Sequence, residues 1–186
     1  MEWLGISMWS ASMISLGARL PFDLDLVAGG VLGYLAADLA SGLVHWFCDS
    51  VGDETTPLAG KLIIGPFREH HRDPQAMTRH GFAELTGNSA CALLPVLVAA
   101  HLLAPPDWLA AAIWSFSLAL FLTNLFHCWA HAEAVPRWIG WLQRRRLILS
   151  PQQHARHHQH GYTAAYCVTS GWMNPLLDRL LRWRHA

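Results

Sequence analysis

The stretch LDLVAGGVLGYLAADLASGLVHWF occupies residues 24–47 and decides the class of fold. It is almost entirely apolar or small, and it exceeds the roughly 20 residues that an α-helix needs to cross the hydrocarbon core of a bilayer. His45 lies near its end, and Asp49 follows shortly after. The sequence therefore predicts a membrane-spanning helix that carries polar, chemically reactive side chains at one end.

The composition of the whole chain agrees with a membrane protein. Of its 186 residues, 53% are hydrophobic and only 14% are charged, which is unusual for a soluble domain. Three further apolar stretches are candidates for spanning helices: Trp3–Leu20, Ser89–Ala104 and Trp108–Ala130. The first has no basic residue before it and no small-residue cleavage site, so we expect a retained helix and not a signal peptide. We predict an all-α integral membrane protein with four spanning helices, forming one domain over residues 1–186.

Lysine and arginine are distributed unevenly between the two ends of these helices. None lies between the third and fourth stretches, and most follow the second or the fourth: Lys61, Arg68, Arg72, Arg79, Arg137, Arg144, Arg145, Arg146, Arg156, Arg179, Arg182 and Arg184. Cytoplasmic loops of membrane proteins are enriched in basic residues. We therefore expect a multi-pass protein whose N- and C-termini and clustered histidines lie on the cytoplasmic side.

The polar segments combine apolar and basic residues in a way that suits helices lying along a membrane surface. The apolar run Leu58–Phe67 is flanked by charged residues, and in the C-terminal tail Trp138, Trp141 and several leucines alternate with arginines. We expect these segments to form a cytoplasmic cap of interfacial helices.

Histidines gather in the same polar segments and at the helix ends. The chain has twelve, and several share helical spacing with a neighbour: His45 with Asp49, His127 with His131, and His154 with His157 and His158. Residues three or four apart lie on one helical face, whereas the adjacent pair His70-His71 differs by about 100° around a helix and would reach two different ions. This pattern predicts a binuclear metal centre. We do not expect His101 or His185 to be ligands, because they lack partners at these spacings, nor His160, because it follows the C-terminal cluster without matching its spacing.

The number and type of ligands indicate the metal. Imidazole suits zinc, copper, iron and nickel, and about nine ligands exceed what one tetrahedral zinc ion uses. Two iron ions would use them all. The zinc-protease pattern His-Glu-x-x-His is absent, because Glu69-His70-His71 runs in the wrong order. A simple ion pair between His45 and Asp49 is the competing interpretation for those two residues.

Four other polar residues are predicted to serve the centre or its substrate. Asp38 lies two turns before His45, and a buried carboxylate there should accept a ring N–H from a ligand histidine. Asn124, three residues before a histidine of the fourth stretch, is expected to do the same. Glu84 and Asn88 lie where the chain re-enters the membrane and are expected to line the path of a lipid, with helix capping as the alternative for Asn88.

Four segments of the sequence are similar to sequence motifs of a known family. They are Asp38–Asp49 (DLASGLVHWFCD), Gly65–Pro74 (GPFREHHRDP), Thr78–Asn88 (TRHGFAELTGN) and Ser150–Tyr162 (SPQQHARHHQHGY). From the second helix to the C-terminus, the chain resembles the plasmanylethanolamine desaturase family, also called CarF-like or Kua lipid desaturases.

The resemblance implies a membrane di-iron enzyme that uses O2 and two electrons to place a cis double bond next to the ether oxygen of an alkyl phospholipid. It implies a ligand set of His45, His70, His71, His80, His127, His131, His154, His157 and His158, with Asp49 where related acyl desaturases have another histidine. We expect no haem-binding domain in this sequence, so a separate cytochrome b5-like or ferredoxin-like donor is expected to bring the electrons. A nucleic-acid partner is not expected.

Three alternatives stay open. The chain could desaturate an acyl chain on phosphatidylglycerol, as plant members of the same superfamily do. It could hydroxylate its substrate, because the same oxidant can return oxygen instead of taking a second hydrogen. From another class, it could be a non-catalytic membrane protein whose histidines bind metal as a sensor.

Overall fold

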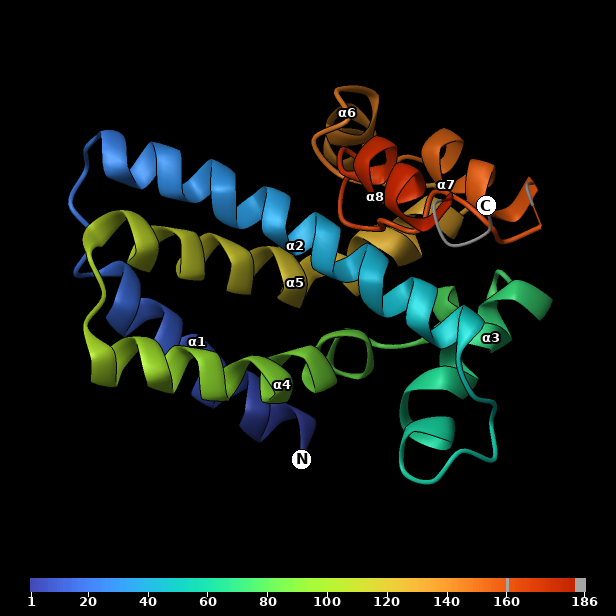
Figure 1. The fold of residues 1–186 in the computed structure, drawn as a ribbon, viewed down its shortest axis with the longest axis horizontal. Helices are drawn as coiled ribbons and strands as arrows, with labels where there is room; N and C mark the ends of the chain where they lie inside the picture. Colours follow the sequence, from blue (N-terminus) through green and yellow to red (C-terminus); the bar gives the residue numbers. More distant parts are fainter. Residues whose placement is uncertain (160, 183–186) are drawn as a thin grey trace. The chain divides into compact units, whose positions relative to one another are not determined.

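The computed structural model describes residues 1–159 and 161–182, and within these ranges every regular element is a helix (Figure 1). The elements are α1 (Glu2–Gly17), α2 (Leu24–Ser50), the π-helix η1 (Gly60–Ile64), α3 (Gly65–Arg72), the 3-10 helix η2 (Ala76–Arg79), α4 (Phe82–Leu103), α5 (Asp107–His131), α6 (Arg137–Arg144), α7 (Pro151–Gln159) and α8 (Asn174–Arg182). The all-α prediction is confirmed. His160 and His185 lie outside the described residues.

Three of the helices are long and apolar enough to cross a membrane, namely α2, α4 and α5. The first predicted span is also a helix, but α1 has 16 residues and is therefore about 24 Å long, shorter than a hydrocarbon core of roughly 30 Å. The described residues thus hold three candidate spans where four were expected.

Local signals explain where several helices begin. The Asp23 side chain accepts the N–H of Leu26 at 3.1 Å in the first turn of α2, as a capping residue does. Proline stands at the start of α3 and of α7, where its missing N–H costs nothing. Helix α5 begins directly after Pro106, the second of two prolines.

Helix α4 begins at Phe82, seven residues before the predicted start, and this changes the roles of two residues. The Glu84 carboxylate accepts the backbone N–H of Gly81 at 2.7 Å and so closes the N-terminus of α4. Asn88 lies within the helix and is exposed. The capping alternative for Asn88 is therefore wrong, and Glu84 makes a capping contact that was not predicted.

Contacts divide the chain into two compact units. The first unit comprises Met1–Ala37 and Gly81–Leu125, and the second comprises Asp38–His80 and the residues from Phe126 onward. The single-domain organisation stays a prediction.

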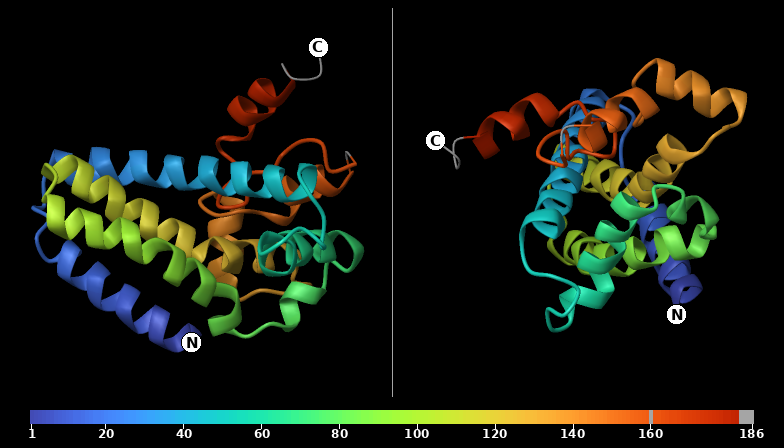
Figure 2. Two further views of the ribbon diagram at one scale, coloured as in Figure 1. Left: turned by 60° about the horizontal axis from the view of Figure 1, so that its bottom comes forward. Right: turned by 90° about the vertical axis from the view of Figure 1, so that its right-hand side faces the viewer.

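In the first unit, α1 and α4 run side by side, as Figure 2 shows. Its core includes Trp9, whose ring stacks on Phe121 with centroids 3.9 Å apart and whose Nε1 donates to Ser117 Oγ at 2.9 Å. Trp114 Nε1 donates to the carbonyl of Met13 at 3.0 Å. Each indole N–H is thus satisfied inside an apolar unit, where an unpaired donor would be costly.

Two glycines of α2 allow a close approach to α5 within the first unit. A Cβ added at Gly29 would overlap the carbonyl oxygen of Trp108, and one added at Gly33 would overlap the carbonyl oxygen of Ala112. Small residues four apart are the usual means by which two helices in a membrane come into backbone contact. A Cβ added at Gly30, between them in sequence, would meet nothing within 4 Å.

The second unit has a core around Tyr166, Cys167 and Leu177. The segments expected to cap the molecule are helical here: Ile139 of α6 and Leu177 of α8 are buried, while Trp138 and Trp141 are exposed. The predicted amphipathic helices α6 and α8 therefore exist. That they lie along a cytoplasmic membrane surface stays a prediction.

We predict that Gly33→Ala lowers the stability of the protein by about 1–3 kcal/mol, the usual cost of forcing extra volume into a packed contact. Thermal unfolding in detergent and the amount of folded protein in membranes would measure the effect. Gly30→Ala is the matched control and should behave like the wild type. Equal stability of the two variants would contradict the close α2–α5 contact.

Candidate metal centre

Nine of the ten predicted ligand residues come together in the second unit. Two groups of histidines have ring nitrogens that all lie within 4.8 Å of one another: His45, His70, His71 and His157 form the first, and His70, His131, His154 and His158 form the second. Asp49 adjoins the first group, and His127 adjoins the second. The residues come from α2, α3, α5 and α7, so four helices supply the two groups.

In the first group the carboxylate of Asp49 faces three rings. Its Oδ2 lies 3.4 Å from His45 Nε2, 3.4 Å from His157 Nε2 and 3.8 Å from His71 Nε2. The Nε2 atoms of His71 and His157 are 3.0 Å apart. The predicted helical spacing of His45 and Asp49 thus places both residues against α3 and α7.

At the second group, the Nε2 atoms of three other histidines surround that of His154. The Nε2 atom of His154 lies 2.9 Å from that of His127, 2.8 Å from that of His131 and 2.9 Å from that of His158. The Nε2 atoms of His127 and His131 are 3.3 Å apart. The helical spacing of four residues, in His127 with His131 and in His154 with His158, therefore presents these rings to one point, as the sequence predicted.

The arrangement of the donor atoms suits coordination of two metal ions better than it suits hydrogen bonds among these side chains. Nitrogen ligands at roughly 2.0–2.1 Å from one ion lie about 3.0–3.4 Å apart, close to the distances in both groups. Among the described residues, the buried Nε2 atoms of His45 and His70 and both carboxylate oxygens of Asp49 have no hydrogen-bond partner. Such atoms are costly unless something binds them. Two groups that share His70 accommodate two ions.

Burial keeps these rings in the state that binds metal. Desolvation, with smaller contributions from neighbouring imidazoles, lowers the pKa of His70 to about 2 and that of His71 to about 3. The same causes lower the pKa of His158 to about 4 and hold the pKa of His154 well below its usual value. The rings are therefore neutral at pH 7, with a lone pair free for an ion.

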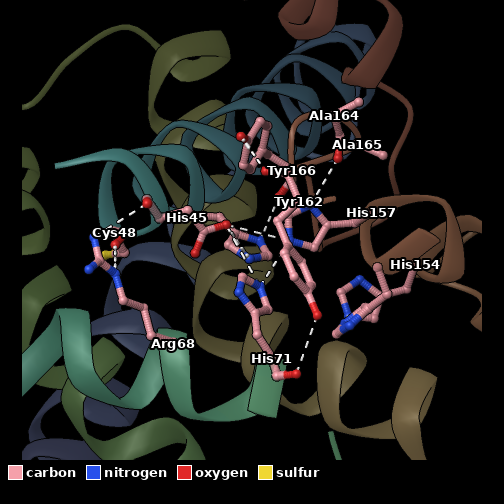
Figure 3. A network of polar contacts seen from close by, with 12 residues as sticks. His45, Cys48, Arg68, His71, His154, His157, Tyr162, Ala164, Ala165 and Tyr166 are labelled. Atoms are coloured by element: carbon pink, nitrogen blue, oxygen red, sulfur yellow. Dashed lines mark hydrogen bonds and ion pairs between the residues drawn. The ribbon is translucent and has the colours of Figure 1, made fainter. Parts of the chain in front are cut away.

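Backbone carbonyls orient two rings of the first group (Figure 3). His45 Nδ1 lies 3.1 Å from the carbonyl oxygen of Tyr166, and His157 Nδ1 lies 2.8 Å from that of Ala164. A carbonyl oxygen only accepts, so each Nδ1 carries the proton and each Nε2 presents its lone pair to the group.

The prediction that Asp38 accepts a ring N–H is wrong. Its fully buried carboxylate accepts three backbone N–H groups, from Ser170 at 2.7 Å, Gly171 at 3.0 Å and Met173 at 2.9 Å. The physical reason is that backbone carbonyls already hold the ring of His45, while the turn at 170–173 has N–H groups to satisfy. Asp38 therefore acts on the centre through the segment 164–173, which supplies those carbonyls.

Two further predicted residues lie elsewhere. Asn124 Nδ2 donates to the carbonyl of Leu85 at 3.0 Å within the first unit, so the prediction of a ring contact is wrong. Asn124 and His127 differ by about 60° around α5, which turns the amide toward α4. His80 is exposed at the end of η2 and belongs to neither group.

Sequence reasoning missed two residues at the centre. The ring of Tyr162 stacks on His71 with centroids 3.9 Å apart, and its hydroxyl donates to the carbonyl of His71 at 3.3 Å. Arg68 donates to three carbonyls at the end of α2, those of Cys48 at 3.0 Å, Asp49 at 3.3 Å and Gly52 at 2.8 Å. Both residues lie in the quoted motifs, which was the available signal.

We predict that Asp38→Asn weakens metal binding about 10–100-fold, the usual effect of losing a group that supports ligands. The amide replaces one acceptor oxygen with a donor that faces backbone N–H groups. Retention of iron during dialysis against a chelator measures the effect. Asp25→Asn, at an exposed position of the same helix, is the control and should retain iron like the wild type; equal loss from both variants would contradict this role.

Because His158 belongs to one of the groups and His80 to neither, we predict opposite effects of replacing these two histidines. His158→Ala removes a ring of the second group, so we expect about one metal ion per chain in this variant and about two in the wild type. His80→Ala should leave the iron content unchanged. Elemental analysis of folded, monodisperse protein decides the matter, and iron loss from His80→Ala would return that residue to the ligand set.

The proteins that this chain is similar to are desaturases, which agrees with a metal centre at this site. The family model of the lipid desaturase domain matches residues 34–186. The chain is 42% identical to a plasmanylethanolamine desaturase of Myxococcus xanthus over 171 residues, covering 85% of this chain and 61% of the relative. It is 40% identical to plasmanylethanolamine desaturase 1 of Mus musculus, covering 86% and 62%, and 34% identical to the chloroplastic fatty acid desaturase 4 of Arabidopsis thaliana, covering 83% and 48%.

The chain thus spans about six tenths of the length of the first two relatives and about half of the third. No solved structure matches it. The match to the family model covers most of the chain, including every residue of both histidine groups. The chain therefore belongs to the lipid desaturase domain family.

Proposed function

We propose that this protein is a di-iron, O2-dependent desaturase that converts plasmanylethanolamine to plasmenylethanolamine, the vinyl ether step of plasmalogen synthesis. The observation that carries the proposal is the convergence of two histidine groups in a chain about 40% identical to plasmanylethanolamine desaturases. Each reaction would remove two hydrogens from neighbouring carbons beside the ether oxygen. With O2, two electrons and two protons as co-reactants, the products are the alkene and two waters.

The two irons would be held by the residues described above. His45, Asp49, His71 and His157 suit one ion, and His127, His131, His154 and His158 suit the other, with His70 within reach of both groups. Bound iron supplies the activation of O2 and the one-electron chemistry that protein side chains lack.

The chain's own residues would position the centre and exclude water from it. His45, His154 and His157 are almost fully buried, and the ring of Tyr162 covers His71. The carbonyls of Ala164 and Tyr166 keep two rings in one tautomer. No nucleophile and no general base is needed, because the reaction removes hydrogens from a saturated chain.

The sidedness and the electron donor belong to the same proposal. Arg144, Arg145 and Arg146 are exposed at the C-terminal end of α6, and such a basic surface suits an acidic cytochrome b5-like or ferredoxin-like donor. The distribution of basic residues supports a cytoplasmic position for both termini and the metal centre.

A second candidate is desaturation of an acyl chain on another phospholipid such as phosphatidylglycerol. The 34% identity to a relative named fatty acid desaturase 4 favours it. The higher identity to the two plasmanylethanolamine desaturases favours the ether lipid.

The decisive experiment expresses the chain in a host without plasmalogens and supplies an alkyl ether phosphoethanolamine lipid with a working electron donor. We expect acid-labile vinyl ether product by mass spectrometry, dependent on O2 and reduced at least 100-fold in His157→Ala. A hydroxylated product would point to the hydroxylase alternative. Iron-loaded protein that acts only on phosphatidylglycerol would establish the acyl-chain candidate instead.

A further inference from the structure

An apolar groove of about 300 Å³ lies on the second unit. One wall is α2 and the other is the turn that contains η1, and its lining residues are Leu43, Val44, Phe47, Cys48, Ala59, Ile63 and Ile64. No charged side chain takes part. Leu43, Val44, Phe47 and Ile63 are each between 44% and 49% exposed, so the groove is accessible from outside the unit.

Both walls of the groove belong to helical segments that also carry residues of the metal centre. On α2, Val44 and Cys48 immediately precede His45 and Asp49 in sequence. The other wall, η1, runs without a break into α3, which carries His70 and His71. π-Helices are rare and occur often at functional sites.

Phe67 follows the groove-lining residues in sequence and contacts the rings. It stands three residues after Ile64, a lining residue, and four residues before His71, so these three side chains lie along one helical face. The centroid of its ring is 5.3 Å from that of His45 and 6.4 Å from that of His70. Apolar side chains therefore continue from the groove to the first histidine group.

We propose that this groove seats the hydrocarbon chain of the lipid substrate and leads its reacting carbons to the first histidine group. The inference rests on the proposed function and adds the place where the substrate lies. The groove has the size of a small ligand site, and its lining offers nothing to a polar ligand.

Shape, and not hydrophobicity, would give the groove its selectivity. A lipid chain in a bilayer is already surrounded by hydrocarbon, so moving it into an apolar groove gains little from the hydrophobic effect. Packing against Val44 and Ile63 would instead determine which chains fit and how far they advance. Filling the groove should therefore change the choice among chain lengths as well as the rate.

The first unit provides a matched control. A second apolar groove, of about 410 Å³, is lined by residues of α4, α5 and the turn between them, including Val96. Its lining residues on α5 end at Ile113, fourteen positions before His127 in sequence. This groove is as apolar as the first but carries no histidine of either group on its walls.

The experiment supplies the iron-loaded protein with an equal mixture of ether lipids that differ in alkyl chain length and measures the ratio of vinyl ether products. We expect Val44→Trp and Ile63→Trp to shift that ratio at least fivefold toward shorter chains without change in iron content. Val96→Trp should keep the wild-type ratio. Because a ratio is internal to each reaction, a lower yield of protein does not disturb it.

Crosslinking gives a second readout that requires no turnover. An ether lipid with a diazirine in its alkyl chain should label the residues around 43–48 and 59–64 of wild-type protein more strongly than those around Val96. Ile63→Trp should reduce this labelling at least fivefold. If either tryptophan variant does not fold, the other variant and the wild-type map still test the proposal.

The two proposals fail in different ways. Wild-type protein that carries iron but yields no unsaturated lipid would overturn the proposed function. Active protein with unchanged product ratios in both groove variants, or with equal labelling of the two grooves, would overturn the groove alone, because the lipid would then be ordinary bilayer lipid around the helices.

Discussion

The hydrogen bonds between the buried Asp38 carboxylate and the turn at 170–173 support much of the second unit. Three N–H groups of that turn point at one side chain with no exposed surface, and bonds to a carboxylate are among the stronger hydrogen bonds in proteins. The segment 164–168 just before the turn uses the same device, because Asp178 accepts the N–H of Ala165 and Asn174 accepts that of Cys167. These side chains thereby satisfy the N–H groups of an irregular stretch of backbone that has no helix or sheet partners.

The histidine groups need such support because they are unfavourable without metal. The Nε2 atoms of His45 and His70 and the oxygens of Asp49 are buried without a hydrogen-bond partner among the described residues, and burial lowers the pKa of His70 and His71 far enough that acid cannot readily charge them in the folded state. Metal binding would relieve this cost, so the affinity for metal and the stability of the fold are linked. If the histidine rings could rotate away from the metal site, they would avoid this cost without metal, and metal binding would then stabilise the fold less.

The sequence predicted the parts of the centre that follow from helical periodicity, and it failed where partners come from distant backbone. Spacing alone placed His127 with His131 and His45 with Asp49, because positions four apart share a face wherever the helix packs. The contact of Asp38 could not be predicted in this way, since carbonyl and N–H groups have no sequence signature. His80 matched a motif of the family, yet η2 ends just before this residue and its ring is exposed.

The motif that ends α2 is best understood as one helical face with one partner. Asp38, Ser41, Gly42 and His45 recur at the spacing of a single stripe, and each contacts the segment 164–173. Ser41 Oγ accepts the N–H of Val168 at 3.1 Å, and a Cβ at Gly42 would meet the Cys167 sulfur at 2.5 Å, so only glycine permits this approach. His45 completes the stripe against a carbonyl of the same segment. The stripe thus fixes the segment, the segment orients the ligand rings, and the opposite face of α2 is left free to form a wall of the groove.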